Sequence, residues 1–187
     1  MSAATPPTPG PPATGEERTP WRECIDTVEV SDARLLAAPL FRKSFGHPVP
    51  PMPRHYVMFY RPSVDAERES GQPVVVGYTH QLAFENVYLA GGMCIDAAAY
   101  RRFPRWLFDA VKREGGLATI IMRDSFATLG DCPAVFGHVG EKRARLADLR
   151  AGFVDTGRLH LMVHWRRPLP REEQERLVER VAGIGPF

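Results

Sequence analysis

The sequence lacks long apolar stretches and lacks an excess of charge of either sign. No apolar run approaches the roughly 18 residues that a membrane-spanning helix needs, so we expect no membrane partner. The 24 basic residues are nearly balanced by 22 acidic ones, which leaves a formal net charge of +2. Because nucleic-acid-binding domains usually concentrate positive charge on one face, this balance argues against a nucleic acid as a partner.

Cysteine is also scarce. Cys24, Cys94 and Cys132 are an odd number of cysteines with no Cys-x-x-Cys pair, which indicates reduced thiols and a cytoplasmic location. The beginning of the sequence lacks the basic head and apolar stretch of a secretory signal. His160 and His164 are four residues apart, which separates them by roughly 13 Å on a strand, so we expect no metal site.

A length of 187 residues suits a single domain with a sizeable core. Residues 1–20 are rich in Pro, Thr, Ala and Gly, and such a segment buries too little apolar area to offset the cost of ordering it. We therefore expect a flexible tail at residues 1–20 and one domain over residues 21–187.

Apolar periodicity and turn residues predict strands that alternate with helices. The predicted strands are 23–30, 54–61, 73–85, 87–96, 117–122 and 158–165. The predicted helices are 33–45, 104–114, 141–151 and 171–181, with a kink or a break at Pro39 in the first of them. A polar turn is expected at 62–72 and a Gly-containing loop at 130–140. Gly91 and Gly92 within a strand indicate a bulge or a close backbone approach.

Two segments, residues 93–106 and 144–153, resemble the GNAT (N-acetyltransferase) superfamily. That superfamily has a central strand, a phosphate-binding turn and helix, and a later helix that ends on Gly-Phe, here Gly152 and Phe153. The order of elements from residue 23 to 165 is similar as well. The resemblance implies an α/β (α+β) fold with a twisted, mostly antiparallel sheet, strand 87–96 at its centre, and helices on its flanks.

The resemblance also implies a place for coenzyme A. The family's turn reads Arg or Gln, two residues, Gly, one residue, then Gly or Ala, and it falls here on residues 101–106, where Pro104 and Trp106 replace both small residues. Pro104 removes a backbone donor and Trp106 is bulky, so coenzyme A is expected to bind weakly or not at all in the usual pose. The expected cofactor-binding residues are the strand end and the nearby arginines: Cys94, Ile95, Asp96, Arg101, Arg102 and Arg105. The three arginines supply charge to the phosphates in one interpretation and are solvated helix-start residues in the other.

Two residues are candidates for catalysis. Asp148 stands four residues before Gly152, where family members often have a Tyr that protonates the leaving thiolate; a carboxylate serves as that acid only if burial raises its pKa. His138 lies between Gly137 and Gly140 in a region that borders the thioester in this family, and its ordinary pKa suits proton transfer near neutrality. The alternatives are a surface carboxylate and a flexible helix-entry loop. His80 and Glu85 lie on opposite faces of strand 73–85, so they are not expected to act as a pair.

The function implied is a GNAT-like acyltransferase that uses acetyl-CoA or another acyl-CoA or acyl thioester. The alternative, which the lost glycines favour, is a non-catalytic protein of the same fold that binds a small ligand or a protein. The expected partners are a small-molecule acyl donor and acceptor, and a homodimer is compatible with the sequence.

Overall fold

A single mixed sheet organises the chain. The computed structural model describes residues 20–62 and 72–187. Residues 1–19 of the tail expected at 1–20, and residues 63–71 of the turn expected at 62–72, lie outside the described residues. The sheet order is β1-β2-β3-β4-β5-β7-β6, and β4 with β5 is the parallel pair in an otherwise antiparallel arrangement. Its strands are β1 (Ile25–Val30), β2 (Arg54–Tyr60), β3 (Val74–Phe84), β4 (Val87–Ile95), β5 (Ala134–His138), β6 (Val154–Asp155) and β7 (Leu161–Trp165).

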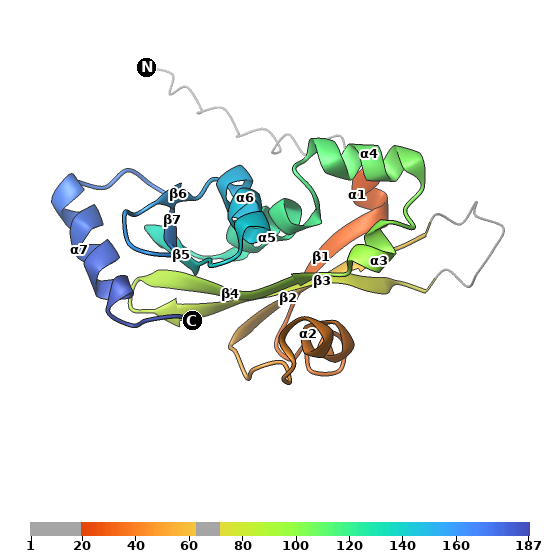
Figure 1. Cartoon of the computed structure of the whole chain (residues 1–187), viewed down its shortest axis with the longest axis horizontal. Helices are drawn as coiled ribbons and strands as arrows, with labels where there is room; N and C mark the ends of the chain where they lie inside the picture. Colours follow the sequence, from red (N-terminus) through yellow and green to blue (C-terminus); the bar gives the residue numbers. More distant parts are fainter. Residues whose placement is uncertain (1–19, 63–71) are drawn as a thin grey trace, which may run out of the picture.

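Helices cover both faces of this sheet (Figure 1). They are α1 (Trp21–Cys24), α2 (Ala38–Phe45), α3 (Ala97–Tyr100), α4 (Arg105–Arg113), α5 (Leu117–Thr128), α6 (Lys142–Ala151) and α7 (Arg171–Ala182). Helices α1, α4, α5 and α6 share apolar clusters with one face, and α2 and α7 share clusters with the other. The predicted fold class, a mostly antiparallel sheet with β4 at its centre and helices on its flanks, is confirmed. Within the described residues, no helix is both long enough and apolar enough to span a bilayer.

Two predictions about local structure were wrong. Residues 117–122 form the first half of helix α5 and not a strand: Leu117, Ile120 and Ile121 are buried at helical spacing. A six-residue apolar run is too short to separate the two periods. The loop predicted at 130–140 contains strand β5, whose first four residues are all buried. Burial on both sides removes the alternation by which a strand is usually detected.

Three other elements begin more than one residue later than predicted, among them strand β7, which begins at Leu161 and not at residue 158. Helix α2 begins only at Ala38, because Pro39 fits the first turn of a helix and not its middle. The residues from 33 to 37 make turns before it. Strand β1 begins at Ile25, because the residues before it form the short helix α1.

The feature that creates a site is the separation of β4 from β5. The parallel pairing covers three residue pairs and ends at Ala90 with Gly137. Directly after it, the register between β3 and β4 shifts, as expected for a bulge at Gly91 and Gly92. Gly92 has a φ of 59°. Beyond this point β4 pairs with β3 while β5 continues beside β7, so the two central strands diverge.

Candidate functional site

A cavity of about 250 Å³ lies where β4 and β5 diverge. Gly91, Gly92 and Gly137 line it at the level of the strands. Residues from both faces of the sheet complete the wall: Phe45 of α2 on one side, and Met122, Ala144 and Asp148 of α5 and α6 on the other. Residues from both faces of the sheet therefore meet around the point where the two strands separate.

Asp148 is the most perturbed acid in this cavity. The residue is 3% exposed, and burial raises the pKa of its carboxyl to about 7. Its Oδ1 atom has no hydrogen-bond partner within residues 20–62 and 72–187. The local fold holds it there: α6 ends at Gly152 with a φ of 101°, and Phe153 is buried in the core directly afterwards. A carboxyl at this position is expected to serve as an acid only if burial raises its pKa, and Asp148 meets this requirement.

His138 lies in the same cavity, at the end of β5. Its half-buried ring is 5.8 Å from the ring of His160 and 6.1 Å from that of Phe187, measured between centroids. The structure thus brings both predicted catalytic residues, His138 and Asp148, to one cavity, although the elements that carry them are β5 and α6.

The predicted cofactor-binding residues on the strand end do not line the cavity. Cys94 is buried against α2, and burial raises the pKa of its thiol to about 11. Ile95 packs into the core on the α4 and α5 side. Asp96 caps α3, where its Oδ1 accepts hydrogen bonds from the N–H groups of Ala98 at 2.9 Å and Ala99 at 3.3 Å.

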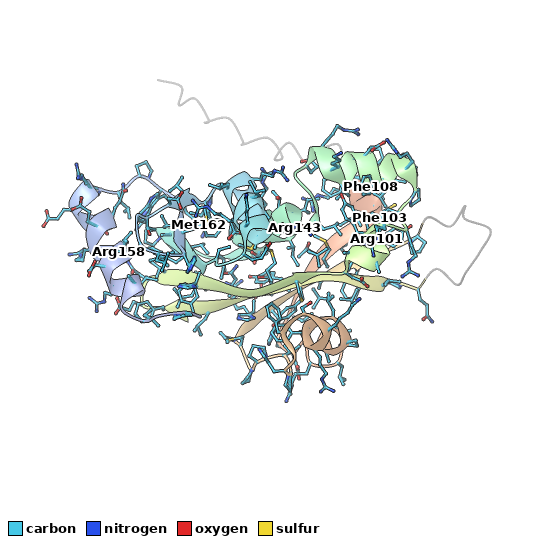
Figure 2. The ribbon with its side chains drawn as sticks, in the orientation of Figure 1. Arg101, Phe103, Phe108, Arg143, Arg158 and Met162 are labelled. Atoms are coloured by element: carbon cyan, nitrogen blue, oxygen red, sulfur yellow. The ribbon has the colours of Figure 1, made fainter. Side chains whose placement is uncertain are left out.

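The predicted arginines lie away from the cavity as well. Arg101 and Arg102 form the turn between α3 and α4, and Arg105 begins α4, where it is paired with Asp109 at 2.7 Å. Figure 2 labels Arg101 and Phe103 in this α3–α4 region and Arg143 on α6. No residue from 101 to 106 is among those that line the cavity.

The expected phosphate-turn spacing occurs a second time, at residues 113–118, which sequence reasoning missed. Arg113 is followed by two residues, Gly116, one residue and Ala118, and this run leads directly into α5. Gly115 and Gly116 have φ values of 98° and 95°, which favour glycine. The signal was present in the sequence, but the interpretation of 117–122 as a strand left no helix for the turn to precede.

Helices α5 and α6 lie side by side and run in the same direction. The Thr119 hydroxyl donates to the Ala147 carbonyl at 3.3 Å, and Arg123 Nη2 donates to the Arg150 carbonyl at 2.6 Å. Ala144, in the first turn of α6, lines the cavity. The first N–H groups of both helices therefore lie at the same end, where helix dipoles favour negative charge.

Comparisons with known proteins give a structural likeness and no match in sequence. No family model and no curated protein matches this sequence. Among solved structures, a crystal structure of AtaTR bound with AcCoA is similar over 83% of this chain and 98% of that chain, with 12% sequence identity and a TM-score of 0.37.

Proposed function

We propose that this protein transfers an acyl group from an acyl thioester, such as acetyl-CoA, to an acceptor amine in the cavity between β4 and β5. The observation that carries the proposal is the Asp148 carboxyl, which is buried, has a pKa of about 7 and lies in the gap between two diverging strands. A carboxyl that keeps its proton near neutrality is an acid, and a reaction that expels a thiolate needs one.

Two side chains, Asp148 and His138, account for the protons that move in the proposed reaction. The amine nitrogen attacks the thioester carbonyl carbon, and the carbon–sulfur bond breaks. Asp148 gives its proton to the departing sulfur, whose ordinary pKa is near that of a cysteine thiol, about 8.5. His138 takes the proton that the attacking nitrogen loses, and this proton replaces the one that Asp148 gave up.

The start of α5 supports a phosphate-bearing donor. Gly116 has no atom within 4 Å of the place where its Cβ would stand, so its backbone is open to close approach. The N–H groups of Leu117, Ala118 and Thr119 begin the helix and have no acceptor inside it. Arg113 and Arg143 are exposed near the starts of α5 and α6, and they are the side chains we expect to pair with phosphates.

Calorimetric titration with acetyl-CoA, followed by thiol release with a panel of amines, tests the proposal. We expect saturable binding of acetyl-CoA, weaker binding of S-acetylpantetheine, which lacks the nucleotide phosphates, and amine-dependent release of thiol. Failure to bind acetyl-CoA would overturn the proposal. Binding without thiol release for any amine would favour the alternative, a protein that binds the ligand without catalysis.

A further inference from the structure

Three buried polar side chains form a hydrogen-bonded row on the α2 face of the sheet. The Tyr78 hydroxyl lies 2.8 Å from Nδ1 of His55 and 3.2 Å from Nδ1 of His80. His55 on β2 and His80 on β3 are direct partners in the antiparallel register. All three residues are almost fully buried, with His55 at 2% and His80 at 6% exposure. The proposed acyl transfer does not use them.

One end of this row lies under the wall of the cavity. A Cβ on Gly91 would stand 2.8 Å from Nε2 of His80, and one on Gly92 would stand 2.5 Å from Cε1 of the same ring. Both glycines line the cavity, so the imidazole is covered there by backbone alone. The absence of side chains at both positions is what allows His80 to lie so close to the cavity.

The other end of the row reaches a different surface. His55 lines a shallow pocket together with Asp32, Arg34 and the proline-rich segment 50–53. This pocket shares no lining residue with the cavity between β4 and β5. The row therefore extends from His80, which lies directly behind two glycines of the cavity wall, to His55, which lines the second pocket.

The hydrogen-bond chemistry gives this row a direction. A tyrosine hydroxyl has one proton, so Tyr78 donates to one imidazole and accepts an N–H from the other. If the Nδ1–H of His80 donates to the Tyr78 oxygen, Nε2 of His80 is unprotonated and is the acceptor at the cavity end. The Tyr78 O–H then donates its hydrogen bond to Nδ1 of His55. His55 then carries its own proton on Nε2. A proton that enters at His80 Nε2 can leave at His55 Nε2 while each bond in the row shifts by one proton.

We propose that His80, Tyr78 and His55 form a proton relay that carries the first proton of the acceptor ammonium from the cavity to the Asp32 pocket. This inference rests on the proposed function. An alkylammonium cannot attack a carbonyl until it loses one proton, and the neutral amine loses a second during attack. The relay removes the first and His138 the second, so one proton is released for each acyl group transferred, which balances the overall reaction.

The charges around the relay are compatible with transport. Burial lowers the pKa of His80 to about 4, lowers that of His55 and raises that of Tyr78, so the row is neutral near pH 7. Cys94 of β4 faces it with a thiol whose pKa burial raises to about 11. At the outer end, Asp32 favours and Arg34 opposes a proton on His55. From α2, the group in contact is the uncharged ring of Phe41.

Tyr78→Phe tests the relay, because it removes one oxygen and keeps the ring in the core. The matched control is Tyr56→Phe on the adjacent strand, where an equally buried tyrosine bonds instead to Thr128 and Glu29. With an alkylamine near pH 7, we expect Tyr78→Phe to lower kcat about a hundredfold with KM unchanged. The loss should shrink as pH rises toward the pKa of the amine, because free amine then enters directly. Equal kcat values for the two variants at every pH would overturn the relay.

A readout that needs no activity separates this proposal from the proposed function. Nitrogen NMR of the imidazoles should find complementary tautomers in the wild type, with one Nδ1 protonated and the other accepting. Tyr78→Phe should abolish this complementarity, whereas Tyr56→Phe should preserve it. Identical tautomers in wild type and Tyr78→Phe would overturn the relay, even if acyl transfer is observed. Complementary tautomers in a protein that does not transfer acyl groups would support the directed hydrogen-bonded row, but would overturn acyl transfer and with it the acceptor ammonium as the source of the proton.

Discussion

The Asp148 carboxyl on α6 faces the backbone of Gly137 on β5, with Oδ2 3.6 Å from the point where a Gly137 Cβ would lie. Gly137 is the last residue of β5 that pairs with β4. The carboxyl therefore lies at the point where the two strands separate, and its burial there sets both its pKa and its expected role.

Asp148 should make the protein less stable as pH rises. The pKa is raised from 3.8 to about 7 on folding, so below 3.8 both states are protonated and there is no penalty. Between these values the unfolded state ionises first, and stability falls with rising pH until about pH 7. The full shift in the pKa of Asp148 corresponds to a loss of at most about 4 kcal/mol in the free energy of unfolding. In urea unfolding, the free energy of unfolding of Asp148→Asn should exceed that of the wild type, and this excess should grow by about 2–3 kcal/mol from pH 5 to pH 8.

The control for this measurement is Asp109→Asn. Asp109 lies on the surface of α4 and pairs with Arg105. The free energy of unfolding of Asp109→Asn should differ from that of the wild type by an amount that does not grow from pH 5 to pH 8. A constant difference for Asp148→Asn would show that the Asp148 carboxyl is not protonated in the folded protein.

Asp148→Asn should also lower turnover. An amide cannot give a proton to a departing thiolate, so kcat should fall by about a hundredfold. In the wild type, kcat should decline above about pH 7, where the carboxyl loses its proton. The pH profile of thiol release checks both expectations, and a decline that persists unchanged in Asp148→Asn would assign it to another group.

His138→Ala should lower turnover by about a hundredfold or more without unfolding the protein, in line with usual losses of a general base. His160→Ala is the matched control, since the two rings are in edge contact but His160 does not line the cavity. Steady-state thiol release with an amine acceptor distinguishes them. Equal turnover for His138→Ala and wild type would remove His138 from the mechanism.

The phosphate-binding turn has two possible placements, residues 113–118 and residues 101–106. They can be distinguished by introducing a glutamate at the equivalent position of each. Ala118 and Trp106 are each the second residue of their helices, α5 and α4. A glutamate in the first turn is favourable for a helix but repels a phosphate. We expect Ala118→Glu to weaken acetyl-CoA binding at least about tenfold and to leave thermal stability intact. Trp106→Glu should leave binding unchanged, and the opposite pattern by calorimetry would restore the site at residues 101–106.

The close approach of His80 to Gly91 predicts a non-additive pair of substitutions. Gly91→Ala puts a Cβ 2.8 Å from the ring, which overpacks the site and should cost about 1–3 kcal/mol. In a His80→Ala background the same change should cost much less, because the ring is gone. Gly140→Ala, which meets no atom within 4 Å, is the control. Equal costs of Gly91→Ala in both backgrounds would contradict the contact.

Local signals in the sequence determined many elements of this protein. Alternating apolar residues and turn residues located β2, β3 and β4 to within one residue of their ends. The pair Gly91 and Gly92 was predicted to mark a bulge or a close backbone approach, and the structure has both. These features depend on contacts between neighbouring residues, which a sequence displays directly.

Other elements depended on what the chain packs against. Strand β5 is buried on both sides, so its sequence has no alternation, and the first residues of α5 are too few and too uniformly apolar to reveal a helical period. Because α5 was not predicted as a helix, the turn at residues 113–118 was not recognised as a helix start. The predicted binding residues from Cys94 to Arg105 depend instead on the placement of the turn at residues 101–106.

The sequence by itself determined the fold class, the order of most elements and the candidates Asp148 and His138. The tertiary structure alone decided that these two side chains line one cavity, that burial raises the pKa of Asp148 to about 7, and that His55, Tyr78 and His80 join in a row. The physical reason is that desolvation and hydrogen bonding depend on neighbours brought together from distant parts of the chain, and residue spacing does not encode those neighbours.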